Sequence, residues 1–448
     1  MKRLLTSVTL VALLVCSPIA ARAADVVLSW NEIAVTTMVS QGASPFAQAR
    51  FMAITQLAVF EAVNAITGDY RPYLGTVAAP AHASADAAAV AAAYAVLKNY
   101  FPAAPNLDSQ YAASLAAIPD GLAKSRGIAT GQAAAAQMIA VRLNDGSSPP
   151  QFSQPASTDP GVWQLTPSCP AAGGVNFQWQ NITPFGVPST PGSKAWIAQF
   201  ALAPPPALTS KRYARDFNEV KRVGNMSSSL ADRPQDRADV ARFYAASSPA
   251  YVFNLAARQV AAAEGSSMSK NARVLALLNM ASNDALVASF WTKYHYNFWR
   301  PETAIHEGSV DGNVGTEGDI TYAPYILTPC FPSYPSNHGS GSNSASEVLI
   351  RAFGAGGHAI TMSNAAVAGL VFHYTRFDQI TDDISDARIF GGIHFRFDQE
   401  GGAELGRDIG TYIYKHNLRR AKHHEHDDDG DHDDDHHDDR HDQPRHRQ

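Results

Sequence analysis

Apolar residues recur every three to four positions over most of this chain, which is the spacing of helices packed into a core. The spacing runs through residues 30–66, interrupted by a Gly-Ala-Ser-Pro run, and through alanine-rich stretches at 83–100 and 107–143. A Pro-Asp-Gly run breaks the second of these stretches, and the helical spacing resumes from residue 193 to residue 263. Alternating patterns typical of strands are sparse. The chain is therefore predicted to have an all-α fold, built as a helical bundle.

Residues 144–191 interrupt this helical pattern. They are rich in Pro, Ser, Gly and Gln and contain the turn-forming runs DGSSPP and STPGS. Glycine and proline favour turns and end helices, so we expect a long irregular connection across the surface here.

Both ends of the chain differ from the part between them. Lys2 and Arg3 precede an apolar run that ends at Cys16, and Ala23 closes a small-residue run, which is typical of a cleaved secretory signal peptide. A lipoprotein signal lipidated at Cys16 is the alternative. The last residues, 421–448, hold 11 acidic residues, 4 basic residues and 8 of the chain's 16 histidines. Such a polar segment cannot bury a core, so we expect a disordered tail.

These patterns divide the chain into four predicted parts. They are a signal peptide (1–23), an N-terminal helical region (24–270), a second helical bundle (271–420) and a His/Asp-rich tail (421–448). After the signal, no run of about 20 uncharged apolar residues indicates a membrane span. We therefore expect an exported protein, either periplasmic or secreted.

Charge and cysteine content narrow the possible partners. Residues 24–420 carry 30 acidic and 28 basic residues, so their net charge is close to zero. No basic face indicates a nucleic-acid partner, and any positive electrostatic potential must come from a local cluster of side chains. Cys169 and Cys330 remain after the signal is removed. In an oxidising compartment they either form a disulfide or stay as two buried thiols, and their spacing does not decide between these alternatives.

Three short segments carry the candidate chemistry, and the first is KYHYNFWRP. A helix predicted over residues 272–300 is apolar on nearly every face and should pack inside the bundle. Lys293 and Arg300 would differ on it by about 20° in azimuth and about 10.5 Å along the axis, so both could reach one anion. Pro301 is expected to end this helix. The alternative is a pair of cations that extend from a helix face to solvent.

The second segment, PSYPSNHG, should place Ser336, Asn337 and His338 at the N-terminus of a helix. Unpaired amide groups and the positive end of the helix dipole favour anions there. A serine at such a place often serves only as a helix cap. His338 is suited to proton transfer, because the unperturbed pKa of an imidazole is about 6.5.

The third segment, ARIFGGIHFRFD, holds Arg388, His394 and Asp398. On one regular helix Arg388 and His394 would lie about 120° apart, so their convergence requires a new helix after the two glycines. We expect that helix over residues 397–416, with Asp398 in its first turn. Asp398 would then either orient His394 through a hydrogen bond or only stabilise the helix dipole.

In this order, the three segments resemble those of the vanadium-dependent haloperoxidases and the related acid phosphatases of the phosphatidic-acid-phosphatase type. The matching residues are Lys293, Arg300, Pro301, Pro335, Ser336, His338, Arg388, His394 and Asp398. The segment FWRPETAI is most similar to the haloperoxidase-like bacterial branch. There are two departures: Asn337 replaces a family glycine that offers its backbone amide to the anion, and Ala387 replaces a serine.

The resemblance implies a site for a tetrahedral oxyanion, with vanadate as the cofactor of a haloperoxidase. The implied oxyanion-binding residues are Lys293, Arg300, Ser336, Asn337, His338, Arg388 and His394. Three of them would be catalytic: His394 as the nitrogen ligand of vanadium, His338 in proton transfer, and Lys293 in polarising bound peroxide. Hydrogen peroxide and a halide would be the substrates, with an organic acceptor as an optional further partner.

Two alternative functions stay open. A soluble acid phosphatase without a cofactor would use His394 to form a phosphohistidine and His338 to protonate the leaving alcohol. A non-enzymatic protein could instead buffer metal ions through its His/Asp-rich tail. The length of the chain, its N-terminal helices and the FWRP phrase favour the peroxidase. Some of the predicted helices are apolar on nearly every face, so the sequence is also compatible with a homodimer.

Overall fold

The structure is a computed structural model that describes residues 25–190 and 193–421. The predicted signal peptide and all but the first residue of the predicted tail lie outside the described residues. Helices dominate the described chain, and one two-stranded sheet accompanies them. The predicted helical bundle is therefore confirmed, with the small sheet as an addition that the sequence pattern did not indicate.

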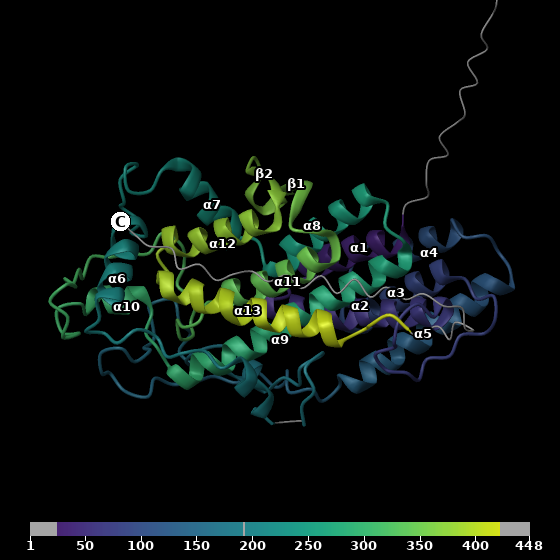
Figure 1. The fold of residues 1–448 in the computed structure, drawn as a ribbon, viewed down its shortest axis with the longest axis horizontal. Helices are drawn as coiled ribbons and strands as arrows, with labels where there is room; N and C mark the ends of the chain where they lie inside the picture. The colour runs from purple at the N-terminus through teal and green to yellow at the C-terminus, as the bar shows by residue number, and fades with distance from the viewer. Residues whose placement is uncertain (1–24, 191–192, 422–448) are drawn as a thin grey trace, which may run out of the picture.

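Five helices make up the N-terminal part. They are α1 (Val26–Ser40), α2 (Pro45–Thr67), α3 (Ala85–Tyr100), α4 (Leu107–Ala116) and α5 (Leu122–Val141). Both predicted breaks are confirmed. Ser44 caps α2 by accepting a hydrogen bond from the amide of Ala47, and Pro45 occupies the first turn. Helices α2, α3 and α5 pack against one another and form one end of the elongated molecule (Figure 1).

The predicted irregular connection is confirmed, because residues 144–190 contain only the short 3-10 helix η1 (Phe177–Asn181). Its backbone is bonded to two later segments of the chain. The amide of Trp163 donates to the carbonyl of Asn297 at 2.7 Å, and the amide of Val175 donates to the carbonyl of Cys330 at 2.9 Å. The connection therefore supports the segments that lead to the candidate site.

Helices resume after this connection, as predicted. They are η2 (Ala195–Phe200), α6 (Lys211–Val223), α7 (Gln235–Ala245) and α8 (Pro249–Glu264). A two-stranded antiparallel sheet, β1 (Gly356–Ser363) and β2 (Val371–Arg376), packs on α8 and pairs Ile360 with Tyr374.

The second bundle is centred on α9 (Met268–Tyr296), which packs against α2, α11 (Asn337–Phe353) and α13 (Arg396–His416). Helices α9, α11 and α13 run through the middle of the molecule in Figure 1. The short α10 (Pro301–His306) and α12 (Phe377–Phe390) complete the bundle. By length and composition α2 and α9 could each cross a membrane, but 83% and 94% of their most apolar windows are buried within the protein, as in core helices.

The helix predicted over residues 272–300 ends earlier than expected. Helix α9 stops at Tyr296, and Asn297 caps it in a left-handed conformation with φ 48°. Arg300 is extended, with φ −84° and ψ 156°, and Pro301 begins α10. The prediction that Lys293 and Arg300 share one helix that Pro301 ends is therefore wrong. The residue before a proline disfavours helical backbone, whereas proline itself suits the first turn of a helix.

Glycines bring α13 unusually close to α11. A Cβ atom on Gly402, Gly406 or Gly410 would lie 2.4 to 2.6 Å from a carbonyl oxygen of Ser336, Ser340 or Ser344, respectively. No side chain fits at such a distance, so the two backbones touch. This contact brings the N-terminus of α11 next to the first turn of α13.

We predict that Gly406→Ala destabilises the protein, because the added Cβ would lie 2.4 Å from the carbonyl oxygen of Ser340 and must force the helices apart. The expected loss in free energy of unfolding is about 1–3 kcal/mol, measured by chemical denaturation. Gly341→Ala is the matched control, since its Cβ would meet Leu286 at an ordinary 3.4 Å. Equal stability of the two variants would contradict a backbone contact between α11 and α13.

Candidate active site

A cavity of about 270 Å³ lies at the N-terminus of α11. The polar part of its wall consists of Asn337, His338, Arg388 and His394, so residues of the second and third sequence segments are brought together. The remaining lining residues are apolar: Pro45, Phe46, Ala245, Pro249, Leu286, Ile326, Leu327, Pro329 and Phe331. The cavity thus combines a small polar cluster with a larger apolar wall.

Lys293 belongs to the last turn of α9, and its side chain is fully buried. Its Nζ donates hydrogen bonds to the carbonyl oxygens of Pro332 at 2.9 Å and Ser333 at 2.7 Å. The ammonium also lies 5.3 Å from the centre of the Phe331 ring. The loop at residues 331–333 thus holds a cation that could otherwise not be buried.

Arg300 reaches the same loop from outside α9. Its Nε donates to the carbonyl of Phe331 at 2.7 Å, and its Nη1 donates to the carbonyl of Ile393 at 3.0 Å. The same Nη1 lies 3.0 Å from Nε2 of His394. Lys293 and Arg300 thus bond the same loop without sharing a helix face, but neither lines the cavity, and their binding of one anion stays a prediction.

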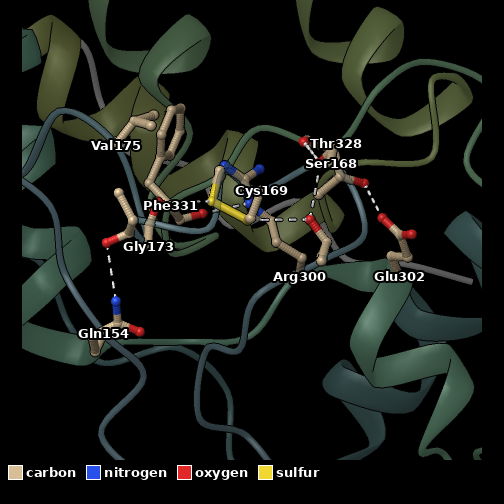
Figure 2. Close-up of a disulfide and its surroundings, with 12 residues drawn as sticks. Gln154, Ser168, Cys169, Gly173, Val175, Arg300, Glu302, Thr328 and Phe331 are labelled. Atoms are coloured by element: carbon tan, nitrogen blue, oxygen red, sulfur yellow. Dashed lines mark hydrogen bonds between the residues drawn. A yellow bond between two sulfur atoms is a disulfide. The ribbon is translucent and has the colours of Figure 1, made fainter.

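A disulfide joins Cys169 to Cys330, with 5.2 Å between their Cα atoms, so the alternative of two free thiols does not hold. Figure 2 shows Arg300 and Phe331 beside this bond. Nearby, the hydroxyl of Ser168 donates to the carbonyl of Thr328 at 2.7 Å. The disulfide thus attaches the irregular connection to the loop whose carbonyl oxygens hold both cations.

His394 lies between α12 and α13, after a turn in which Gly392 has a φ of 81°. This confirms the predicted new helix after the glycines. Nδ1 of His394 lies 2.8 Å from Oδ2 of Asp398, which also accepts hydrogen bonds from the hydroxyl of Ser333 at 2.6 Å and the amide of Phe395 at 3.0 Å. Because an arginine can only donate, the contact with Arg300 makes Nε2 the acceptor, so the proton resides on Nδ1. Asp398 thus orients the imidazole, as one of the two interpretations predicted.

Ser336, Asn337 and His338 occupy the N-terminus of α11, as predicted. The Oγ of Ser336 accepts a hydrogen bond from the amide of Gly339 at 3.2 Å, so this serine is a helix cap. The amide of Ser336 donates to the carbonyl of Asp398 at 2.9 Å, which joins the second and third segments. His338 is half-buried at the cavity wall. Direct binding of an anion by the Ser336 hydroxyl stays a prediction.

Several buried donors in this cluster lack a partner among the residues that the structure describes. They are Nη2 of Arg300, Nε and Nη1 of Arg388, and Nδ2 of Asn337. A buried cation or amide without an acceptor is costly, because it loses its hydration and gains nothing in return. A multiply charged oxyanion would supply acceptors to all of these donors at once. The donor set therefore fits vanadate or phosphate.

Burial and mutual repulsion shift the pKa values of the site. Burial, followed by the charges of neighbouring cations, lowers the pKa of His338, His394 and Lys293 well below their ordinary values. Burial also lowers the pKa of Arg300 to about 9 and that of Arg388 to about 10, so both stay charged near neutral pH. The site is thus strongly electropositive, with two neutral imidazoles.

The sequence did not single out the residues that support this cluster. Ser333 bonds Asp398 through its hydroxyl and Lys293 through its carbonyl oxygen, and Phe331 bonds Arg300. Phe46 comes from α2, far from the motifs in the chain. The only signal in the sequence was that Phe331 and Ser333 lie close along the chain to the motif at residues 335–338. No group of three or more His, Cys, Asp and Glu side chains suited to a metal cation occurs within residues 25–190 and 193–421.

Comparison with known proteins agrees with the family resemblance of the three sequence segments. The family model of the VCPO second helical-bundle domain matches residues 273–423. No curated protein sequence matches the chain. Among solved structures, the first bacterial vanadium-dependent iodoperoxidase has a TM-score of 0.73 at 24% identity, covering 88% of this chain and 96% of its own.

Two further structures are similar. They are the apo and holo types of a bacterial vanadium-dependent chloroperoxidase, with TM-scores of 0.67 and 0.62 at 16% and 17% identity. Each match covers 83% of this chain, and 94% and 92% of the other chain, respectively. The similarity therefore extends over both helical parts of the molecule and establishes the fold.

We predict that binding of a tetrahedral dianion takes up protons. An anion stabilises the charged forms of His338 and Lys293, so it raises pKa values that burial and neighbouring cations hold low. Sulfate is a suitable probe because it does not titrate itself near neutral pH. Calorimetry in buffers of different ionisation enthalpy should show net proton uptake, with affinity that falls as the pH rises. Net proton release would contradict these pKa shifts.

We also predict that the disulfide stabilises the oxyanion site. Replacing Cys169 and Cys330 together by serine should lower the free energy of unfolding by about 2–5 kcal/mol and weaken sulfate binding, because the loop that holds Lys293 and Arg300 loses its anchor. Thermal unfolding and calorimetry measure the two effects. The wild-type protein under oxidising and reducing conditions is the control. Sulfate affinity that is unchanged without the disulfide would show that the loop is held by other contacts.

Proposed function

We propose that this chain, which carries the VCPO second helical-bundle domain and has the fold of bacterial vanadium-dependent haloperoxidases, oxidises a halide to hypohalous acid with hydrogen peroxide. The observation that carries the proposal is the group of buried, unpartnered arginine donors of Arg300 and Arg388 beside His394. These groups are suited to a multiply charged oxyanion, and vanadate is the one that would enable peroxide chemistry.

Charged side chains and backbone amides would both bind such an anion. Lys293, Arg300 and Arg388 would supply positive charge to it, and they come from the end of α9, the residue before α10 and α12. The amide groups at the start of α11 add neutral donors and the positive end of the helix dipole. Bound vanadate would supply a Lewis acid that activates hydrogen peroxide toward a halide.

His394 and His338 have different roles in this proposal. Asp398 keeps the proton of His394 on Nδ1, so Nε2 carries the lone pair that would bind the central atom of the oxyanion. Nη1 of Arg300 now donates to this lone pair and would have to turn to an oxygen of the anion when it binds. His338 makes no comparable bond to a carboxylate among the contacts described for it, and it stands at the cavity wall. The overall reaction consumes one proton for each hypohalous acid formed. An anion that raises the pKa of His338 would prepare this imidazole to deliver that proton.

The walls of the cavity favour the peroxidase over the phosphatase. Apart from the polar cluster, the described lining residues are apolar, and none of them offers a hydrogen bond to the alcohol of a phosphate ester. Peroxide and a large, weakly hydrated halide need no such partner. A volume of about 270 Å³ also suits small reactants.

We further propose that the protein is exported. The N-terminal segment has the pattern of a secretory signal peptide. The Cys169–Cys330 disulfide supports this proposal, because such bonds persist mainly in oxidising compartments. Export would also give the enzyme access to extracellular peroxide and halide.

Two histidine variants test the proposed reaction after vanadate loading in phosphate-free buffer. His394→Ala should abolish peroxide-dependent oxidation of bromide or iodide, because it removes the nitrogen that binds the central atom. His338→Ala should retain vanadate binding but lower turnover by about 100-fold or more, as expected for a lost proton donor. Turnover is measured by the halogenation of a chromogenic phenol, and vanadate binding by calorimetry.

His373→Ala is the matched control, because His373 is exposed on β2 and contacts only Thr361 among its described hydrogen bonds. It should leave turnover unchanged. Rapid hydrolysis of phosphate esters by a vanadate-loaded protein that shows no peroxide-dependent turnover would refute the proposal. That result would favour the phosphatase, in which His394 is the nucleophile.

A further inference from the structure

Asn337 is the first residue of α11 and stands where the resembled family has a glycine. Its side chain is buried, with 5% of the residue exposed, yet it belongs to the cavity wall. The Oδ1 atom accepts a hydrogen bond from the hydroxyl of Ser289 at 2.7 Å. The Nδ2 atom, at the other end of the same amide, has no partner among the described residues.

Ser289 pairs with one end of this amide. It lies on α9, is fully buried, and comes one turn before Lys293 on the same helix. With its hydroxyl donating to Oδ1, the amide oxygen is paired with α9 and the amino group is left without a partner in a residue that lines the cavity. The neighbours of Asn337 on the cavity wall are His338, Arg388 and His394, all of which present nitrogen atoms. None of them accepts a hydrogen bond from Nδ2, and a bound oxyanion would supply the missing acceptor.

We infer that Asn337 donates a hydrogen bond from its side-chain Nδ2 to the bound oxyanion, and that Ser289 is the positioning residue that orients the amide for this contact. A glycine at this place could offer only its backbone amide, so the chain gains one donor to the anion. The inference rests on the proposed function in that it assumes an oxyanion in this cavity. It holds for vanadate and for phosphate alike, since both present the same tetrahedral oxygens.

The opposite orientation of the amide makes the opposite prediction. With Oδ1 toward the cavity, the partial negative charge of the oxygen would repel the anion, and removal of the side chain would strengthen binding. The two orientations are therefore distinguished by the sign of one change in affinity. If the Ser289–Asn337 contact is purely structural, its removal changes the stability of the protein but leaves the anion affinity of the folded protein unchanged.

The test measures dissociation constants of orthovanadate and of inorganic phosphate by calorimetry, on the full chain. Asn337→Gly should weaken the binding of both anions by about tenfold, as expected for one lost hydrogen bond to a charged group. Ser289→Ala should weaken binding less, because the amide becomes free to rotate but stays present. Ser289→Ala in the Asn337→Gly background should have no further effect, since Ser289 acts through Asn337.

Ser282→Ala is the matched control. Ser282 lies two turns earlier on α9, is equally buried, and has no partner for its hydroxyl among the described residues. Its replacement should leave both dissociation constants unchanged, and circular dichroism should show that every variant is folded. Unchanged or tighter anion binding by folded Asn337→Gly would overturn the inference.

The same titrations separate this inference from the proposed function. Wild-type protein that binds vanadate with no dependence on Asn337 refutes the inference and leaves the peroxidase proposal intact. Wild-type protein that binds phosphate but not vanadate refutes the peroxidase proposal, and the phosphate data then decide the role of Asn337. Wild-type protein that binds neither anion refutes both.

Discussion

The burial of three cations in a helical bundle is the constraint on which the rest of this structure depends. Helical carbonyl oxygens are already bonded within their own helices, so Lys293 and Arg300 need acceptors from irregular backbone. The loop at residues 331–333 supplies them, and the Cys169–Cys330 disulfide and the irregular connection hold that loop in place. Much of the non-helical chain can thus be understood as support for buried charge.

One hydrogen-bond network connects this charge to the imidazole at its centre. Ser333 offers its carbonyl oxygen to Lys293 and its hydroxyl to Asp398, and Asp398 orients His394. The close approach of α13 to α11 also lets the amide of Ser336 bond the carbonyl of Asp398. A shift of either helix would therefore disturb the cations, the imidazole and the helix N-terminus together.

The division between polar and apolar cavity walls determines which chemistry suits this site. The polar cluster can neutralise a multiply charged anion, since unpaired donors of Arg300 and Arg388 are buried beside it. The apolar walls, with Phe46 and Phe331 among them, limit the water that could compete for these donors. Low polarity would strengthen each electrostatic contact with an anion and would suit the weakly hydrated halide of the proposed reaction.

The sequence by itself determined the helical class, the main breaks between helices and the three motifs, because these depend on local periodicity, on glycine and proline, and on residue type. It placed Asp398 in the first turn of α13 and His394 just before it, since helix starts have local signals. Only the tertiary structure decided that the two cysteines pair and that Ser333, Phe331 and Phe46 complete the site. These features depend on contacts between segments far apart in the chain, and periodicity carries no information about such distances. The amide of Asn337 shows the same limit, because its hydrogen-bond partner is Ser289, 48 positions away.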